Sequence, residues 1–102
     1  MAHIRHIVMW KFRNDCELSR AEVTEKMKLD LESLKGKIPG LLSIEVGINV
    51  KESEKAFDAV LVSEFDSMES LDNYKKHPLH VPIREFCKAH RSERVFVDYS
   101  VD

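Results

Sequence analysis

The sequence predicts an α+β domain, and three observations support this prediction. Four segments alternate apolar and polar residues with a period of two, which is typical of β-strands. Two segments between these strands carry apolar residues at helical spacing, after residues that favour helix starts. The length of 102 residues is that of one ordinary domain. We therefore expect a single domain over residues 1–102.

The composition excludes several classes of protein. With 43% hydrophobic and 33% charged residues, the chain resembles an ordinary globular protein and not a disordered or fibrous one. The net charge of −2 argues against general nucleic-acid binding. Apolar runs reach only about four residues, which excludes a membrane span or a signal segment. Cys16 and Cys87 are too few for a disulfide framework, so we expect reduced thiols and a cytoplasmic location.

Charge is spread unevenly along the chain. Residues 45–72 hold eight acidic side chains against two lysines. Residues 75–94 hold six lysines and arginines against two glutamates, with three histidines added. This asymmetry is suited to steering an anionic ligand or to complementing a second subunit. The alternative interpretation is that both segments are ordinary solvated surfaces.

The first half of the chain predicts a strand followed by a helix. Residues 4–13 form the expected strand, because apolar side chains recur at every second position. Ser19 and Glu22 have the spacing of a capping box, so the helix should start there and run to about Lys35. Gly36 is expected to cap its C-terminus. One stripe of this helix belongs to the core: Val23, Met27, Leu31 and Leu34.

Two further strands and a second helix follow. Residues 42–50 and 57–65 alternate in the same way, and the polar connection between them is consistent with a hairpin. Asp66 marks the start of the second helix. This helix should end near His77, because Pro78 pushes the residue before it out of the helical region.

The last part of the chain predicts a short helix and a fourth strand. Apolar residues around and after Pro82 have helical spacing, and residues 94–99 alternate again. The resulting order β-α-β-β-α-β is the split βαβ, or ferredoxin-like, topology. The predicted fold is thus a ferredoxin-like subunit with an antiparallel sheet.

Both faces of the predicted sheet carry apolar residues. Helices cover only one face of such a sheet, whereas an antiparallel face open to water is normally polar. The second face should nevertheless contain four apolar side chains: Ile7, Met9, Val60 and Val62. A monomer would expose this patch to solvent at a cost. We therefore predict a homodimer in which two sheets pack face to face and close into a barrel.

The stretch from Tyr74 to Val81 contains the chemistry-bearing side chains. Tyr74, His77 and His80 lie close together around Pro78, and histidine has the ordinary pKa nearest to neutral pH. This is the one patch in the sequence suited to moving protons. The alternative is that these imidazoles only bond the backbone of a helix junction. No carboxylate or thiolate lies next to the two histidines, so we expect no metal site.

Five segments together resemble a known family. They are His6–Arg13, Lys37–Gly40, Glu64–Ser67, Tyr74–Val81 with its His-Pro-x-His core, and Val97–Tyr99. In order and spacing these segments resemble the stress-responsive dimeric α/β-barrel (Dabb) domain, over nearly the whole chain. The resemblance implies a homodimer of ferredoxin-like subunits with the sheets in a central barrel, the helices outside and no cofactor.

The resemblance does not imply one activity, because the family includes plant stress proteins, polyketide cyclases and members without an assigned reaction. We expect small-molecule binding or a structural role, and whether the chain is an enzyme stays open. The alternative is a cofactor-free cyclase or lyase acting on a polyketide-like or other carbonyl substrate. In that case His80 is the base and Tyr74 the hydrogen-bond donor. A further alternative is a cofactor-free monooxygenase, which no residue specifically supports.

The resemblance also implies a ligand pocket between helices and sheet. Its candidate ligand-binding residues are His6, Trp10, Leu31, Ala59 and Arg94. His6 matches a pocket histidine of the cyclase-like members, although a buried structural histidine is the alternative. Ala59 stands where those members carry a further histidine, and Trp10 replaces a smaller residue and should narrow the pocket. Arg94 is suited to an anionic ligand at the rim, and a solvated or interfacial role is its alternative.

Overall fold

The computed structural model describes residues 3–101, which form four strands and three helices. In chain order these are β1 His3–Phe12, α1 Arg20–Glu32, β2 Leu41–Ile48, β3 Ala59–Phe65, α2 Met68–Lys76, α3 Val81–His90 and β4 Arg91–Val101. The predicted order of elements is confirmed, including the short helix before the last strand.

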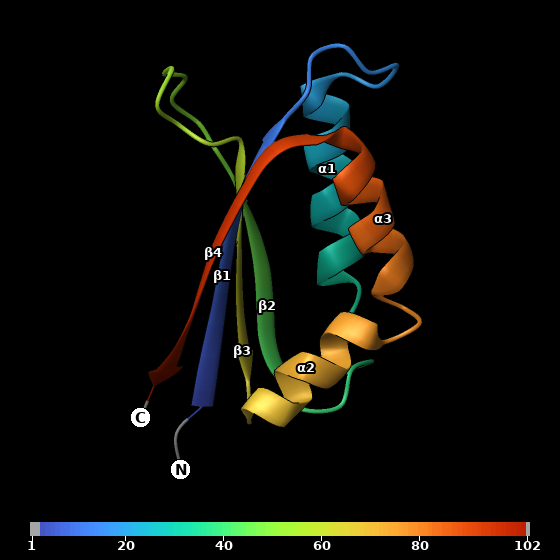
Figure 1. The fold of residues 1–102 in the computed structure, drawn as a ribbon, viewed down its shortest axis with the longest axis vertical. Helices are drawn as coiled ribbons and strands as arrows, with labels where there is room; N and C mark the ends of the chain where they lie inside the picture. Colours follow the sequence, from blue (N-terminus) through green and yellow to red (C-terminus); the bar gives the residue numbers. More distant parts are fainter. Residues whose placement is uncertain (1–2, 102) are drawn as a thin grey trace.

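The strands form one antiparallel sheet in the order β2-β3-β1-β4. This is the strand order of the split βαβ topology, with β1 and β3 in the centre. All three helices of residues 3–101 lie on one side of the sheet, and none of them covers the other side (Figure 1). The predicted α+β, ferredoxin-like fold is confirmed.

The first helix starts as predicted but ends earlier. Ser19 accepts a hydrogen bond from the Glu22 backbone, and the Glu22 side chain accepts one from the Ser19 backbone, which completes the capping box. The helix ends at Glu32 and not near Lys35. The next residues form tighter i to i−3 bonds, such as Lys35 N–H to the Glu32 oxygen at 3.3 Å. These turns lead into Gly36, whose φ of 81° favours glycine.

Other boundaries differ from the predictions by a few residues. The strands predicted over 42–50 and 57–65 are shorter, while the last strand is longer than 94–99 because it pairs with β1 along its whole length. Ser67, and not Asp66, caps α2 by accepting from the Ser70 backbone. Helix α3 already begins before Pro82, which occupies its first turn, where its missing N–H is not needed.

Alternate residues of β1 point toward the helices and are buried. The five positions are Ile4, His6, Val8, Trp10 and Phe12. They pack with the buried stripe of α1, which contains Val23, Met27 and Leu31, and with the buried face of β3. Burial of this apolar surface is the main stabilising contribution to the fold. His6 is the polar exception on this strand, and it marks the position of the site.

The opposite sheet face carries two apolar rows that run across three strands. One row joins Val62, Ile7 and Val97 through the strand register, and the next joins Val60, Met9 and Val95. Met9, Val95 and Val97 are exposed to solvent. The predicted patch of four residues therefore continues onto β4.

Within residues 3–101 no helix is both long enough and apolar enough to cross a membrane.

Candidate functional site

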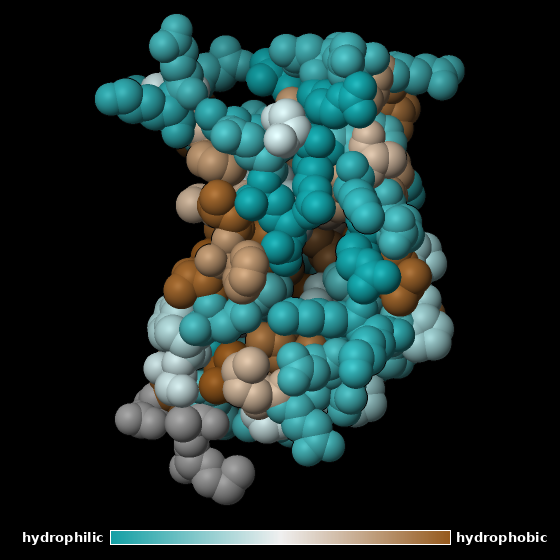
Figure 2. Space-filling model, viewed as in Figure 1, coloured by the Kyte–Doolittle hydropathy of each residue, from teal (hydrophilic) through white to brown (hydrophobic). Residues whose placement is uncertain are grey.

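A cavity of about 400 Å³ lies between the helices and the sheet. Strands β1, β3 and β4 provide one wall, and helices α1, α2 and α3 provide the other. Figure 2 shows a hollow between the sheet and the helices, with hydrophobic surface inside it and hydrophilic side chains around it. Six predicted site residues line the cavity: His6, Trp10, Leu31, Tyr74, His80 and Arg94. Ala59 does not line it and instead pairs with Trp10 across the sheet.

The proline break after α2 brings Tyr74 and His80 together. Tyr74 lies in the last turn of α2, and His77 is extended, with ψ of 136°, as expected of a residue before proline. The His80 N–H then donates to the His77 oxygen at 2.9 Å and closes a turn. As a result the Tyr74 and His80 rings lie 4.1 Å apart, centroid to centroid, at an interplanar angle of 38°.

The Tyr74 phenol is buried without a hydrogen-bonding partner. Its side chain is 1% exposed, and no atom of residues 3–101 bonds its hydroxyl group. The Phe65 ring packs against it at 5.0 Å, and the His6 ring approaches edge-on at 6.5 Å. Burial strongly raises the pKa of Tyr74, because the phenolate would be poorly solvated there. At neutral pH the hydroxyl is therefore protonated and can donate a hydrogen bond.

The His80 imidazole is neutral and also has an unpaired atom. Burial lowers the pKa of His80 to about 4, and the backbone carbonyl of Lys75 acts in the opposite direction. Nδ1 is buried and has no partner among the described residues. A proton on the other ring nitrogen, Nε2, leaves Nδ1 as an acceptor. The alternative in which His80 only bonds its loop backbone leaves this nitrogen unexplained.

His6 is held by a carboxylate that the sequence analysis did not single out. Asp98 on β4 lies opposite His6 in the strand register, and its Oδ1 pairs with His6 Nδ1. Burial lowers the pKa of His6, while Asp98 raises it. The carboxylate fixes the ring orientation, as in base–orienter pairs of many enzymes. The alternation of Arg94, Phe96 and Asp98 in the last strand was the signal that would have placed Asp98 on the helix-facing side of the sheet.

Trp10 narrows the cavity but leaves it open. The indole is 4% exposed and stacks on Phe12 at 6.4 Å. Its Nε1 is a third buried polar atom without a partner in residues 3–101. Three residues that line the cavity, Trp10, Tyr74 and His80, thus each carry a buried polar atom without a partner among the described residues.

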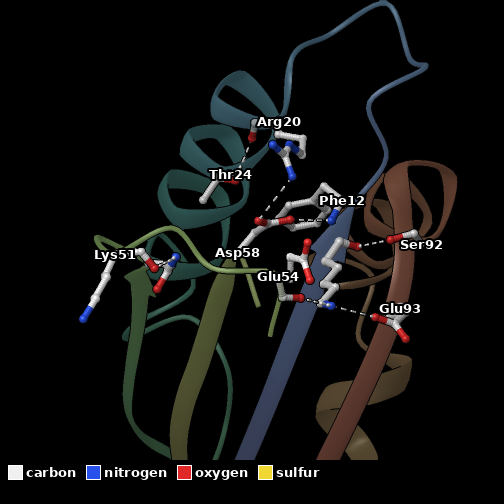
Figure 3. A network of polar contacts seen from close by, with 10 residues as sticks. Phe12, Arg20, Thr24, Lys51, Glu54, Asp58, Ser92 and Glu93 are labelled. Atoms are coloured by element: carbon white, nitrogen blue, oxygen red, sulfur yellow. Dashed lines mark hydrogen bonds and ion pairs between the residues drawn. The ribbon is translucent and has the colours of Figure 1, made fainter. Parts of the chain in front are cut away.

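A larger hollow of about 1050 Å³ lies near the β2–β3 connection and the start of α1. Several of its polar side chains are already paired (Figure 3). Asp58 accepts from the Phe12 N–H at 2.7 Å and lies 3.9 Å from Arg20. Lys11 donates to the Glu54 backbone oxygen at 3.3 Å and lies 3.4 Å from Glu93. These contacts connect the end of β1 to the β2–β3 connection, so we assign the network a structural role.

No group of three or more His, Cys, Asp or Glu side chains in the described part of the chain is arranged to hold a metal ion.

Fold and cavity together define a small ferredoxin-like α+β protein with a pocket between its sheet and its helices. The chain belongs to the stress responsive A/B barrel domain (Dabb) family, whose family model matches residues 4–101. This confirms the family that the sequence resembles. Membership in the family assigns no specific reaction to the chain.

Three similar proteins illustrate the range of the relatives. A dimeric protein of unknown function with a ferredoxin-like fold from Bacteroides fragilis is 31% identical, with 97% of this chain and 96% of that chain covered and a TM-score of 0.86. Olivetolic acid cyclase from Cannabis sativa is 22% identical over 99 residues, which is 95% of each chain. Hydroxynitrile lyase from Passiflora edulis is 15% identical, with 98% and 94% covered and a TM-score of 0.79.

Proposed function

We propose that this protein binds a compact, largely apolar small molecule that carries a hydroxyl group. The observation that carries the proposal is a pair of unsatisfied buried polar atoms, the Tyr74 hydroxyl and His80 Nδ1, on two residues that line one cavity. Buried polar groups in proteins are nearly always paired, so each exception needs an explanation. A ligand that bonds both atoms is such an explanation.

A hydroxyl group on the ligand suits this pair better than other polar groups do. The protonated Tyr74 phenol donates, and the neutral His80 ring accepts at Nδ1. A phenol or enol hydroxyl can accept from the first and donate to the second at the same time. A carbonyl oxygen can only accept, and it would leave the imidazole unsatisfied.

The walls and size of the cavity support an apolar body for this ligand. Aliphatic and aromatic side chains make up much of the lining: Val8, Trp10, Met27, Leu31, Leu61 and Ile83. A volume of about 400 Å³ is in the usual range of small-molecule sites. The combination of apolar walls and a few convergent polar atoms is typical of such sites.

A matched pair of probes tests this proposal. We expect 4-ethylphenol to bind in the cavity at least about tenfold more tightly than 4-ethylanisole, whose methyl ether cannot donate to His80; tenfold corresponds to about 1.4 kcal/mol. Titrations followed by amide chemical shifts give both the affinity and the location. His80→Phe should remove most of the preference for the phenol, and Tyr74→Phe, which removes the donor to both probes, should weaken the binding of both. Tyr99→Phe, a substitution of the same kind on the open sheet face, should leave both affinities unchanged.

Equal affinity for the two probes would contradict the proposal. Shift changes centred on the hollow near Asp58, and not on the cavity, would contradict it as well.

A second candidate function is a cofactor-free cyclase or lyase, and the paired imidazoles favour it specifically. His80 can take a proton from a carbon next to a carbonyl, while Tyr74 donates to the developing enolate oxygen. The His6–Asp98 pair provides a second oriented imidazole in the same cavity. Two proteins that are similar to this chain are named as a cyclase and a lyase. They are olivetolic acid cyclase and hydroxynitrile lyase.

We rank this candidate second because a base with a pKa of about 4 is weak at neutral pH. Proton abstraction predicts that solvent deuterium enters the α-position of a ketone probe such as cyclohexanone, and that His80→Gln removes this exchange. In that step His80 takes the α-proton, the phenol bonds the enolate oxygen, and a deuteron returns to the same carbon. Exchange at the buffer rate would remove this candidate and leave the binding proposal intact.

We also propose that the chain forms a homodimer through the open sheet face. The apolar rows that contain Ile7, Met9, Val60 and Val62 support this arrangement, as does their continuation onto β4 through Val95 and Val97. The similar protein from Bacteroides fragilis is described as dimeric. A second copy would remove the exposed members of these rows, Met9, Val95 and Val97, from water.

A further inference from the structure

The mouth of the cavity carries an excess of positive charge. Five cationic side chains line the cavity, and we call them the mouth cations: Lys75, Arg84, Lys88, Arg91 and Arg94. Among the described residues, Glu85 is the one acidic residue in the same lining. The whole chain has a net charge of −2, so this concentration of positive charge is local. A cleft lined by one sign of charge attracts ligands of the opposite sign.

Most of the mouth cations are not paired with a carboxylate. Arg84 donates to the Lys75 backbone oxygen at 3.0 Å and lies 3.6 Å from Glu85. Within residues 3–101 the charged groups of Lys75, Lys88, Arg91 and Arg94 form neither an ion pair nor a hydrogen bond. The carboxylate of Asp98 is engaged by His6. The positive charge at the mouth is therefore available to a ligand.

Arg94 occupies the position from which a cation can reach a ligand seated in the cavity. It pairs with Trp10 in the strand register, so it lies on the helix-facing side of β4. Its guanidinium lies 4.9 Å from the centre of the Phe96 ring, which restricts its orientation. Its charge lowers the pKa of Tyr74 and of His80, which places it within electrostatic reach of both.

We propose that the cavity selects small monocarboxylates. The carboxylate binds the Arg94 guanidinium at the mouth, with the other mouth cations around it, and the apolar body of the ligand extends inward. Where the ligand carries a hydroxyl group at its far end, that group reaches Tyr74 and His80; this part rests on the function proposed above. A planar carboxylate matches the planar donor fork of an arginine. Arg94 and the other mouth cations thus specify an acid, which the Tyr74–His80 pair alone does not.

Matched acids and amides test the selection of anions. The probes are 4-hydroxybenzoate with 4-hydroxybenzamide, and hexanoate with hexanamide, since each amide has nearly the shape of its acid without the charge. Amide chemical shifts in the intact protein give the affinity and the location. We expect each acid to bind in the cavity at least about tenfold more tightly than its amide, with an affinity that falls as salt concentration rises.

Arg94→Gln should abolish most of this preference, because it should weaken the binding of the acids far more than the binding of the amides. Lys51→Gln removes the same charge from the connection between β2 and β3, where the lysine side chain points away from the network around Asp58 (Figure 3). It should leave the preference intact. The midpoint temperature of thermal unfolding is measured for both variants as a control. A midpoint equal to that of the wild type excludes loss of folding as the cause of either result.

The outcomes separate this inference from the proposed function. Equal binding of acid and amide in the cavity overturns the selection of anions and leaves the binding function standing. A preference for acids that survives Arg94→Gln overturns the role of Arg94. An acid preference that depends on Arg94, together with an affinity for 4-hydroxybenzoate that Tyr74→Phe leaves unchanged, supports the inference and contradicts the hydroxyl-binding pair. Absence of binding of all four probes in the cavity overturns the inference for this ligand class.

Discussion

The Tyr74 and His80 rings lie 4.1 Å apart, and the phenol hydroxyl of one and Nδ1 of the other are both without partners in the described chain. Leaving a buried donor or acceptor unsatisfied costs about 1–3 kcal/mol. A pair kept only for stability would be expected to bond to each other or to the backbone. We therefore interpret the two residues as a site in which ligand affinity has been favoured over the stability of the fold.

We expect Tyr74→Phe to stabilise the protein by about 1 kcal/mol, because it removes an unsatisfied hydroxyl from the core and keeps the ring contacts with Phe65. Urea unfolding of the variant and the wild type measures this difference. A loss of stability of more than about 1 kcal/mol would show that the hydroxyl is satisfied in the folded protein, for example by an ordered water.

His80→Ala should cost less than about 2 kcal/mol of unfolding free energy. The His80 side chain makes no capping bond to α3, and its Nδ1 has no partner among the described residues. The ring contact with Tyr74, the apolar surface of the imidazole and its interaction with the Lys75 carbonyl are lost. Denaturant unfolding tests this value, and failure of the variant to fold would assign His80 a structural role.

The low pKa of His80 predicts a specific dependence of stability on pH. The neutral ring is favoured in the folded state, with a pKa of about 4, whereas the unfolded value is about 6.5. Its stabilising contribution is therefore complete above about pH 6.5 and is lost as the pH falls toward 4. Between about pH 7.5 and pH 5, the wild type should lose about 1–2 kcal/mol more than His80→Gln does.

The comparison with His80→Gln isolates the contribution of His80 to the pH dependence of stability. Carboxylates and His6 also titrate at low pH, but they are present in both proteins. Parallel loss of stability in the two proteins would mean that the imidazole is as well solvated in the folded state as in the unfolded chain.

Asp98→Asn should lower the pKa of His6 further. Burial already lowers this pKa, and the Asp98 carboxylate is the group that raises it. Removing the negative charge while keeping the shape leaves only the lowering effects. Proton NMR titration of the His6 ring in both proteins checks the direction. An unchanged titration of His6 would show that its pairing with Asp98 is not formed in solution.

Val97→Asp should convert a homodimer to a monomer. Val97 is 52% exposed and lies in an apolar row beside Ile7 on the face that we propose as the interface. Leu29→Asp is the matched control, because Leu29 is 62% exposed on α1, on the other side of the sheet. Sedimentation at one concentration compares the three proteins. A wild-type monomer, or a dimer that survives Val97→Asp, would contradict this interface.

Local patterns in the sequence were sufficient for the topology, because strand alternation and helix caps depend on neighbouring residues. The end of α1 was predicted wrongly. The residues after Glu32 suit both a helix and a series of tight turns, and the protein forms the turns. Tyr74 and His80 were predicted because they are six positions apart in the chain, around a proline with a known effect on the backbone. Their catalytic roles, the interface residues and the cytoplasmic location stay predictions.

Other features of the site depend on contacts between distant segments. Asp98 meets His6 across 92 positions, and only the strand register brings the two together. The basic segment was visible in the sequence, but a charge run does not tell whether its members face a cavity or water. The unpaired states of the Tyr74 hydroxyl and His80 Nδ1 depend on side-chain orientation, which no local pattern determines.

The most direct test of the account is the nitrogen NMR spectrum of the His80 ring at neutral pH, with and without 4-ethylphenol. We predict a neutral ring in the free protein, and a resonance of Nδ1 that shifts toward the protonated range when the phenol binds, while that of Nε2 changes little. A charged ring in the free protein, or an Nδ1 resonance that does not respond to bound phenol, would contradict the account.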